Sequence, residues 1–127
     1  SLGAVCSAGL ITKESTHRPS EGLGSAAFRH GPMEMLGDHV FVMVFAGEER
    51  TRALNESLVV DARAAGARAF LVAEDADRPA LRLPAVPSLA RPVVEILPVE
   101  MLTLAIPALD GREAGTFRVG GKVTTVE

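Results

Sequence analysis

The sequence has one cysteine, no excess of basic residues and no long hydrophobic run, and each lack excludes a class of protein. Cys6 cannot form a disulfide within the chain, and its apolar neighbours favour a packed side chain over a nucleophile. Thirteen basic residues against 16 acidic ones give a formal net charge of −3, which provides no positive field for nucleic acid. The longest apolar run, 40–46, is too short to cross a bilayer. We therefore expect no nucleic-acid and no membrane partner.

Targeting and cofactor motifs are also missing. No basic segment followed by an apolar core opens the sequence, which together with the lone cysteine predicts a cytoplasmic protein. Gly22-Leu23-Gly24 lacks the third glycine and the preceding strand of a dinucleotide site. His30 and Glu34 are four residues apart, but Pro32 disturbs a helix between them and no third ligand follows at a useful spacing. We expect no cofactor and no metal.

What the sequence contains is an alternation of helical and strand patterns. Residues 1–16 predict a helix rich in small residues, which stops before Pro19. A buried strand is predicted over 40–46, an amphipathic helix over 48–65 and a second buried strand over 69–73. This order predicts an α/β fold in which helices flank a parallel sheet.

Finer features of these elements can also be predicted. Ser25 is a plausible N-cap for a helix over 26–36. The buried face of the helix over 48–65 is predicted at three- and four-residue spacing, from Leu54, Leu58, Ala62 and Ala65. The polar run 74–78 follows a strand at the sheet edge where parallel sheets carry sites, but it also fits a solvated loop.

Prolines dominate the stretch from 78 to 98. Five of them interrupt it, which excludes long helices and favours short strands over 81–83 and 93–97. A last helix is predicted over 99–109, weakened by Pro107.

Residues 13–32, KESTHRPSEGLGSAAFRHGP, are the most informative segment. A helix ending in Lys-Glu is followed by a turn that contains Glu21 and then by Arg-His-Gly-Pro. Without a gap, this segment resembles the sugar isomerase (SIS) family, in particular the second SIS domain of glucosamine-6-phosphate synthases. Residues 97–105 are similar to the last helix of that family and 111–127 to its C-terminal tail, so the resemblance covers essentially the whole chain.

The resemblance implies a three-layer αβα sandwich around a parallel sheet, the flavodoxin-like SIS fold. It divides the chain into a C-terminal SIS domain over 1–110 and a tail over 111–127 that closes over an active site. The first strand of the family and its Ser/Thr-rich phosphate loop have no counterpart in these residues. The resemblance therefore implies an incomplete domain from the C-terminal part of a longer polypeptide.

Three catalytic residues follow from the resemblance. An aldose–ketose interconversion needs a base between C1 and C2, a group that opens the ring and a charge that stabilises the enediolate. Glu14 matches the base; partial burial beside Leu10 and Ile11 would raise its pKa toward neutrality. His30 matches the ring-opening residue, which in this family acts in the site of the neighbouring subunit and so implies a homodimer. Lys122 matches the tail lysine, whose ammonium group would stabilise the oxyanion.

Glu21, Ser25 and Arg118 are the candidate substrate-binding residues. A structural role for Glu21, anchoring the turn through backbone amides, is equally open, and Arg118 fits either tail carboxylates or phosphate. His17 and His39 have no support from the motif and fit surface or strand-edge positions.

Two departures from the synthase pattern bear on activity. Ile11 stands where synthases carry a second lysine, and Ser7 replaces a glutamate one turn earlier. The resemblance thus favours a phosphosugar isomerase or amino-sugar-phosphate deaminase that acts on a hexose 6-phosphate without a cofactor. The alternative is a non-catalytic SIS module that binds a phosphosugar as a regulatory effector, and the departure at Ile11 favours that alternative.

Overall fold

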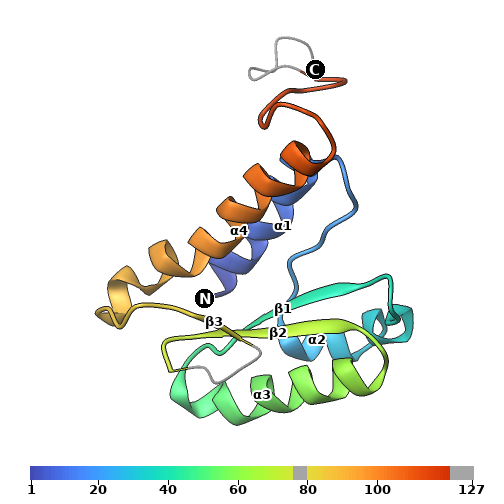
Figure 1. Ribbon diagram of the computed structural model, residues 1–127. Helices are drawn as coiled ribbons and strands as arrows, with labels where there is room; N and C mark the ends of the chain where they lie inside the picture. The colour runs from blue at the N-terminus through green and yellow to red at the C-terminus, as the bar shows by residue number, and fades with distance from the viewer. Residues whose placement is uncertain (76–79, 121–127) are drawn as a thin grey trace.

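Helices and strands alternate along the computed structural model, which describes residues 1–75 and 80–120 (Figure 1). The elements are α1 (Leu2–Thr16), α2 (Ser25–Arg29), the 3₁₀ turn η1 (Pro32–Met35), β1 (Phe41–Phe45), α3 (Glu49–Ala64), β2 (Arg68–Ala73), β3 (Ala80–Arg82), the 3₁₀ turn η2 (Ser88–Ala90) and α4 (Arg91–Leu109). The predicted helices over 1–16 and 48–65 and the predicted strands over 40–46, 69–73 and 81–83 are confirmed to within two residues.

The strands form a parallel sheet in the order β1-β2-β3. Phe41 pairs with Arg68 at the start of the β1–β2 ladder, and Leu71 pairs with Ala80 at the start of the β2–β3 ladder. Helix α3 connects β1 to β2, as a parallel pair requires a crossover. The prediction that 40–46 is fully buried is wrong at its start, because Phe41 at the edge of the sheet is 50% exposed.

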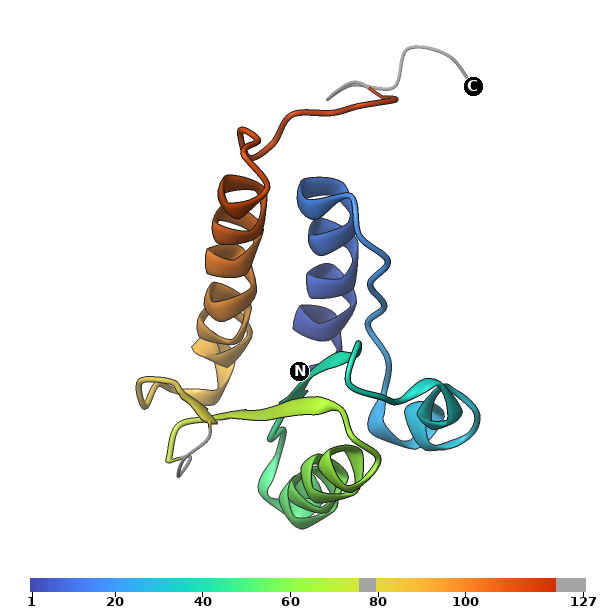
Figure 2. The same ribbon diagram turned by 45° about the vertical axis from the view of Figure 1, so that its right-hand side comes forward.

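Helices cover both faces of this sheet, which confirms the αβα architecture. Helices α2 and α3 lie on one face, and α1 and α4 lie on the other (Figures 1 and 2). Successive residues of a strand point to opposite faces. Val44 therefore packs with Leu58 and Ala62 of α3, while Phe45 packs with Ala8 of α1 and Val99 of α4.

Small residues let the chain pack closely against α1. After α1 the backbone runs back along this helix toward α2 (Figure 2), and Gly22 lies against its first turns. A Cβ atom on Gly22 would lie 2.1 Å from the carbonyl oxygen of Val5, and one on Gly9 would lie 2.5 Å from the amide nitrogen of Gly22. Only glycine fits at both positions without a shift of the backbone.

The predicted helix over 26–36 is shorter than expected. α2 ends at Arg29, and Gly31 has a φ of 134°, a conformation that breaks the helix before η1 begins at Pro32. Ser25 is the first residue of α2 and Gly24 is its N-cap, without a side-chain bond to the helix. The prediction of Ser25 as N-cap is therefore wrong.

The prediction of a strand over 93–97 and of no long helix before Pro98 is also wrong. Helix α4 runs without interruption from Arg91 to Leu109. Pro92 lies in its first turn, where the backbone amide has no helical partner to lose. Pro98 is tolerated inside the helix because α4 packs along α1, and burial of residues such as Val99 offsets the lost hydrogen bond.

The buried face of α3 is rotated from its predicted position. Leu58 and Ala62 are buried as expected, but Leu54 is 65% exposed and Ala65 lies at the exposed C-cap. Asn55 and Val59 take the buried places. An asparagine can be buried here because both polar atoms of its side chain have a hydrogen-bond partner.

One helical segment, Ser88–Leu109, is long and apolar enough by length and composition to cross a membrane, with a mean hydropathy of 1.7. This is weak evidence of a membrane span, because a core helix of a soluble protein passes the same test. From the sequence, only the continuous apolar run over 40–46 was considered. Charged residues such as Arg91 and Glu95 interrupt the apolar residues of Ser88–Leu109, so this segment was not recognised.

Candidate functional site

A shallow cleft of about 440 Å³, widely open to solvent, lies between the end of α1 and the tail. Its lining comes from two segments far apart in the sequence, residues 13–14 and 17–19 on one side and residues 117–120 on the other. His17 follows α1 in the left-handed conformation, with a φ of 57°, and so turns the chain sharply at the mouth of the cleft. The predicted base and part of the predicted tail therefore meet at one place.

Glu14 lines this cleft, but it is not partly buried as predicted. Its side chain is exposed, because the last turns of α1 extend beyond the sheet (Figure 1). Leu10, predicted to form an apolar wall, is 53% exposed, and Ile11 packs into the core between α1, α4 and the sheet. The carboxylate is thus accessible to a ligand in the cleft.

Basic groups outnumber acidic ones around the cleft. Lys13, Arg18 and Arg118 line it together with the imidazole of His17, with Arg18 paired to Asp110, and Glu14 is the one carboxylate among the described residues of the lining. Phe117 adds an aromatic ring that is 43% exposed. A surface of this composition suits a small polar ligand that carries negative charge.

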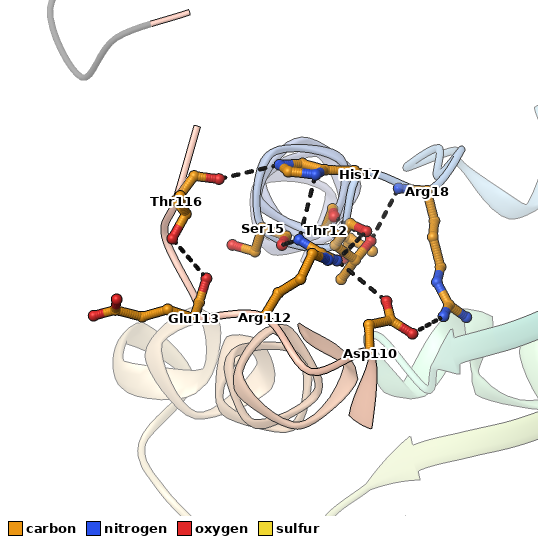
Figure 3. Close-up of polar contacts among 9 residues, drawn as sticks. Thr12, Ser15, His17, Arg18, Asp110, Arg112, Glu113 and Thr116 are labelled. Carbon is orange, nitrogen blue, oxygen red and sulfur yellow. Dashed lines mark hydrogen bonds and ion pairs between the residues drawn. The ribbon is translucent and has the colours of Figure 1, made fainter. Parts of the chain in front are cut away.

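Polar contacts join the end of α1 to the residues that follow α4 (Figure 3). Arg112 donates to the carbonyl oxygen of Thr16 over 2.8 Å and to the carboxylate of Asp110 over 3.2 Å. Asp110 also accepts from Arg18 over 2.7 Å. His17 completes the set, with Nε2 3.1 Å from the carbonyl oxygen of Thr116. We call these five contact residues, His17, Arg18, Asp110, Arg112 and Thr116, the tail anchor.

The ion pairs of the tail anchor lead to a prediction of how the stability of the protein depends on pH. The hydrogen bond from Arg112, assisted by the charge of Arg18, holds the pKa of Asp110 below its ordinary value of 3.8. Because the pKa is lowered in the folded state, the ion pairs stabilise the protein above 3.8 and are lost as pH falls through the folded pKa. In a carboxyl-carbon NMR titration we expect an Asp110 midpoint below 3.8, which Arg112→Met raises. An unchanged midpoint in the variant would contradict the contact.

His30 lies far from Glu14 within one chain. It is the exposed C-cap of α2, on the α3 face of the sheet, whereas Glu14 is on α1 at the opposite face (Figure 1). The structure does not bring these two predicted catalytic residues together. Glu21 is exposed on the segment between α1 and α2 and does not line the cleft.

The hydroxyl of Ser25 has a partner within the protein. It donates to Oδ1 of Asn55 over 2.6 Å, and Nδ2 of Asn55 donates to the carbonyl oxygen of Ala46 over 2.8 Å. This chain of bonds fixes the start of α2 to the carboxyl end of β1. Substrate binding by Ser25 stays a prediction.

Ion pairs occupy the described part of the predicted polar edge. Glu74 pairs with Arg91 at 3.3 Å, and Asp75 pairs with Arg52 at 2.6 Å. The hydrogen bond from Arg52 lowers the pKa of Asp75. Paired surface groups of this kind fit the solvated-loop interpretation of this edge.

Lys122 and residues 76–78 lie outside the described residues. Over 1–75 and 80–120, no three histidine, cysteine or acidic residues lie close enough together to hold a metal ion. Sequence analysis missed His17 and Arg112, which matter for the geometry of the cleft. Nothing in their local sequence marks them, because their partners lie more than 90 residues away.

The chain is similar in sequence to known enzymes, although no protein-family model matches it. Glutamine–fructose-6-phosphate aminotransferase (isomerizing) of Streptomyces coelicolor is 28% identical over 129 residues, and its counterpart from Thermus thermophilus is 28% identical over 125. In both cases the match covers 93% of this chain but 21% of the relative. The chain thus spans about a fifth of the length of these relatives.

Solved structures agree with the sequence comparison. The C-terminal domain of glucosamine-fructose-6-phosphate aminotransferase from Francisella tularensis superposes with a TM-score of 0.74 over 87% of this chain and 34% of that chain, at 17% identity. The chain has the fold of an SIS domain. Tagatose-6-phosphate ketose/aldose isomerase from Escherichia coli gives a TM-score of 0.76 over 97% of this chain and 37% of that chain, at 19% identity. The fold therefore agrees with the resemblance of the sequence motifs to the SIS family.

Proposed function

We propose that this chain is the part of a phosphosugar isomerase or amino-sugar-phosphate deaminase that supplies the base and the tail of its active site. The observation that carries the proposal is the cleft in which Glu14 and residues 117–120 meet. The named relatives, an aminotransferase that isomerises and a ketose/aldose isomerase, support the same class of substrate, a hexose 6-phosphate.

Glu14 has the access that a base needs. Its carboxylate is exposed at the cleft and can approach a carbon-bound proton of an open-chain sugar. Arg118 lies on the opposite wall, where its positive charge would attract the anionic substrate. Lys122, four residues further along the tail, is proposed to stabilise the enediolate oxygen.

His30 is proposed to open the sugar ring in the site of a second subunit. Its position on the α3 face of the sheet, away from the Glu14 cleft, supports this division because one chain cannot present both groups to one substrate. We therefore propose a homodimer, cytoplasmic and without a cofactor, in which Glu21 and Ser25 bind the substrate.

A regulatory module is the second candidate function. Ile11 stands where synthases carry a lysine, and its side chain packs in the core rather than in the cleft. A protein that only binds a phosphosugar needs the basic lining of the cleft but no base.

Exchange of the C2 proton in heavy water, followed by NMR, separates the two functions. The protein is the longest gene product that contains this chain, and the substrates are fructose 6-phosphate and glucosamine 6-phosphate. Exchange supports the isomerase. Binding of either sugar without exchange supports the regulatory module, and absence of both rejects the phosphosugar proposal.

A further inference from the structure

His17 occupies a backbone conformation that is uncommon for residues other than glycine. In the described part of the chain it is the one non-glycine residue with a positive φ, 57°. Glycine is the usual residue where a helix ends in this conformation, because a Cβ atom is disfavoured there. A non-glycine residue in this conformation motivates a hypothesis about the task of its side chain.

The ring of His17 makes two contacts across the molecule (Figure 3). Nδ1 lies 3.3 Å from Nη1 of Arg112, and Nε2 lies 3.1 Å from the carbonyl oxygen of Thr116. A guanidinium group can only donate and a carbonyl oxygen can only accept. Nδ1 must therefore be the acceptor and Nε2 the donor, so the partners select the neutral tautomer with the proton on Nε2.

Both partners of the ring are themselves held in place. Arg112 is fixed by the carbonyl oxygen of Thr16 and by Asp110, which also pairs with Arg18. The hydroxyl of Thr116 donates to the carbonyl oxygen of Glu113 over 2.9 Å, closing a turn that presents the Thr116 carbonyl group to His17 (Figure 3). The imidazole thus joins two ordered segments.

The contacts are not needed to end the helix. The backbone amide of His17 caps α1 by donating to the carbonyl oxygen of Lys13, and any residue with an amide hydrogen can do the same. The ring instead reaches Thr116, directly before the tail residues that line the cleft.

We propose that His17 is a positioning residue, which holds residues 116–120 against the end of α1 through its Nε2 proton, with the tautomer selected by Arg112 and Thr116 together. The contact keeps Arg118 and Phe117 opposite Glu14 and so preserves the cleft. The consequence for catalysis rests on the proposed function, whereas the positioning of the tail does not.

His17→Gly tests the proposal, because glycine suits the positive φ and α1 should fold at least as well. In the longest gene product that contains this chain, we expect the backbone ¹⁵N order parameters of residues 113–120 to fall from about 0.85, typical of a rigid backbone, toward values below about 0.6. The urea midpoint should stay the same or rise. Unchanged order parameters in this segment would overturn the proposal.

His17→Gln is the matched control. Its amide offers one acceptor for Arg112 and one donor for Thr116, as the imidazole does. We expect it to keep the order parameters of residues 113–120 at their wild-type values, while His17→Leu, which offers neither, should resemble His17→Gly. If leucine keeps the segment as rigid as glutamine does, the contact is only packing and the proposal is wrong.

A spectroscopic measurement tests the tautomer independently. The ¹⁵N chemical shifts of His17 should show a protonated Nε2 and a bare Nδ1 in the wild-type protein at neutral pH. Arg112→Met should shift the Nδ1 resonance and leave the proton on Nε2, because the Thr116 carbonyl oxygen still requires a donor there. A bare Nε2 in the wild type would overturn the assignment. None of these measurements requires sugar turnover, so they remain decisive if the proposed isomerase activity fails.

Discussion

Replacement of Glu14 by glutamine is expected to lower C2-proton exchange about 10²- to 10⁴-fold, the usual contribution of a general base. Glutamine has nearly the same shape as glutamate but cannot accept the proton. Since Glu14 is exposed at the end of α1, the substitution should leave the fold intact. Exchange is measured by NMR in heavy water with fructose 6-phosphate and glucosamine 6-phosphate.

Glu100→Gln provides the control for this experiment. Glu100 is an exposed glutamate on α4 and does not line the cleft, so the same loss of one negative charge should leave exchange within about twofold of the wild type. Equal effects of the two substitutions would show that net charge matters rather than a base at position 14. Full activity of Glu14→Gln would remove Glu14 from the mechanism.

Gly22→Ala is expected to lower the free energy of unfolding by about 3 kcal/mol or more. The new methyl group would lie 2.1 Å from the carbonyl oxygen of Val5 and 2.8 Å from the Cα atom of Cys6. Both are backbone atoms of α1, so no side-chain rotation can relieve the overlap. The segment that follows α1 must move away from the helix or α1 must shift, and the urea midpoint measures the loss.

Gly3→Ala, within the helix that Gly22 packs against, is the matched substitution. A Cβ atom at Gly3 has no other heavy atom within 4 Å, apart from its own helix backbone and neighbours. Alanine should stabilise α1 there by up to about 1 kcal/mol because it lowers the entropy of the unfolded chain. Opposite signs for the two substitutions would establish close packing at Gly22; equal and small effects would rule it out.

The sequence predicted elements well where local pattern and tertiary packing agree. The strand over 69–73 and the helix over 48–65 have strong hydrophobic patterns, and both are present. It failed at α4, because the cost of Pro98 is local and visible in the sequence, whereas the packing against α1 that offsets it is not. The buried face of α3 was misplaced for the same reason, since the partners that satisfy Asn55 come from Ser25 and Ala46.

For the candidate site, the sequence by itself determined the motif and hence the resemblance, because residues 13–32 match a pattern of neighbouring residue types. The tertiary structure decided which of those residues share a cleft. It places Glu14 with Arg118, 104 positions later in the sequence, and separates Glu14 from His30, 16 positions later, by the thickness of the sheet. The tertiary structure also determines the contacts of His17. Its ring joins the end of α1 to Thr116 only because α1 and α4, which are far apart in the sequence, pack together.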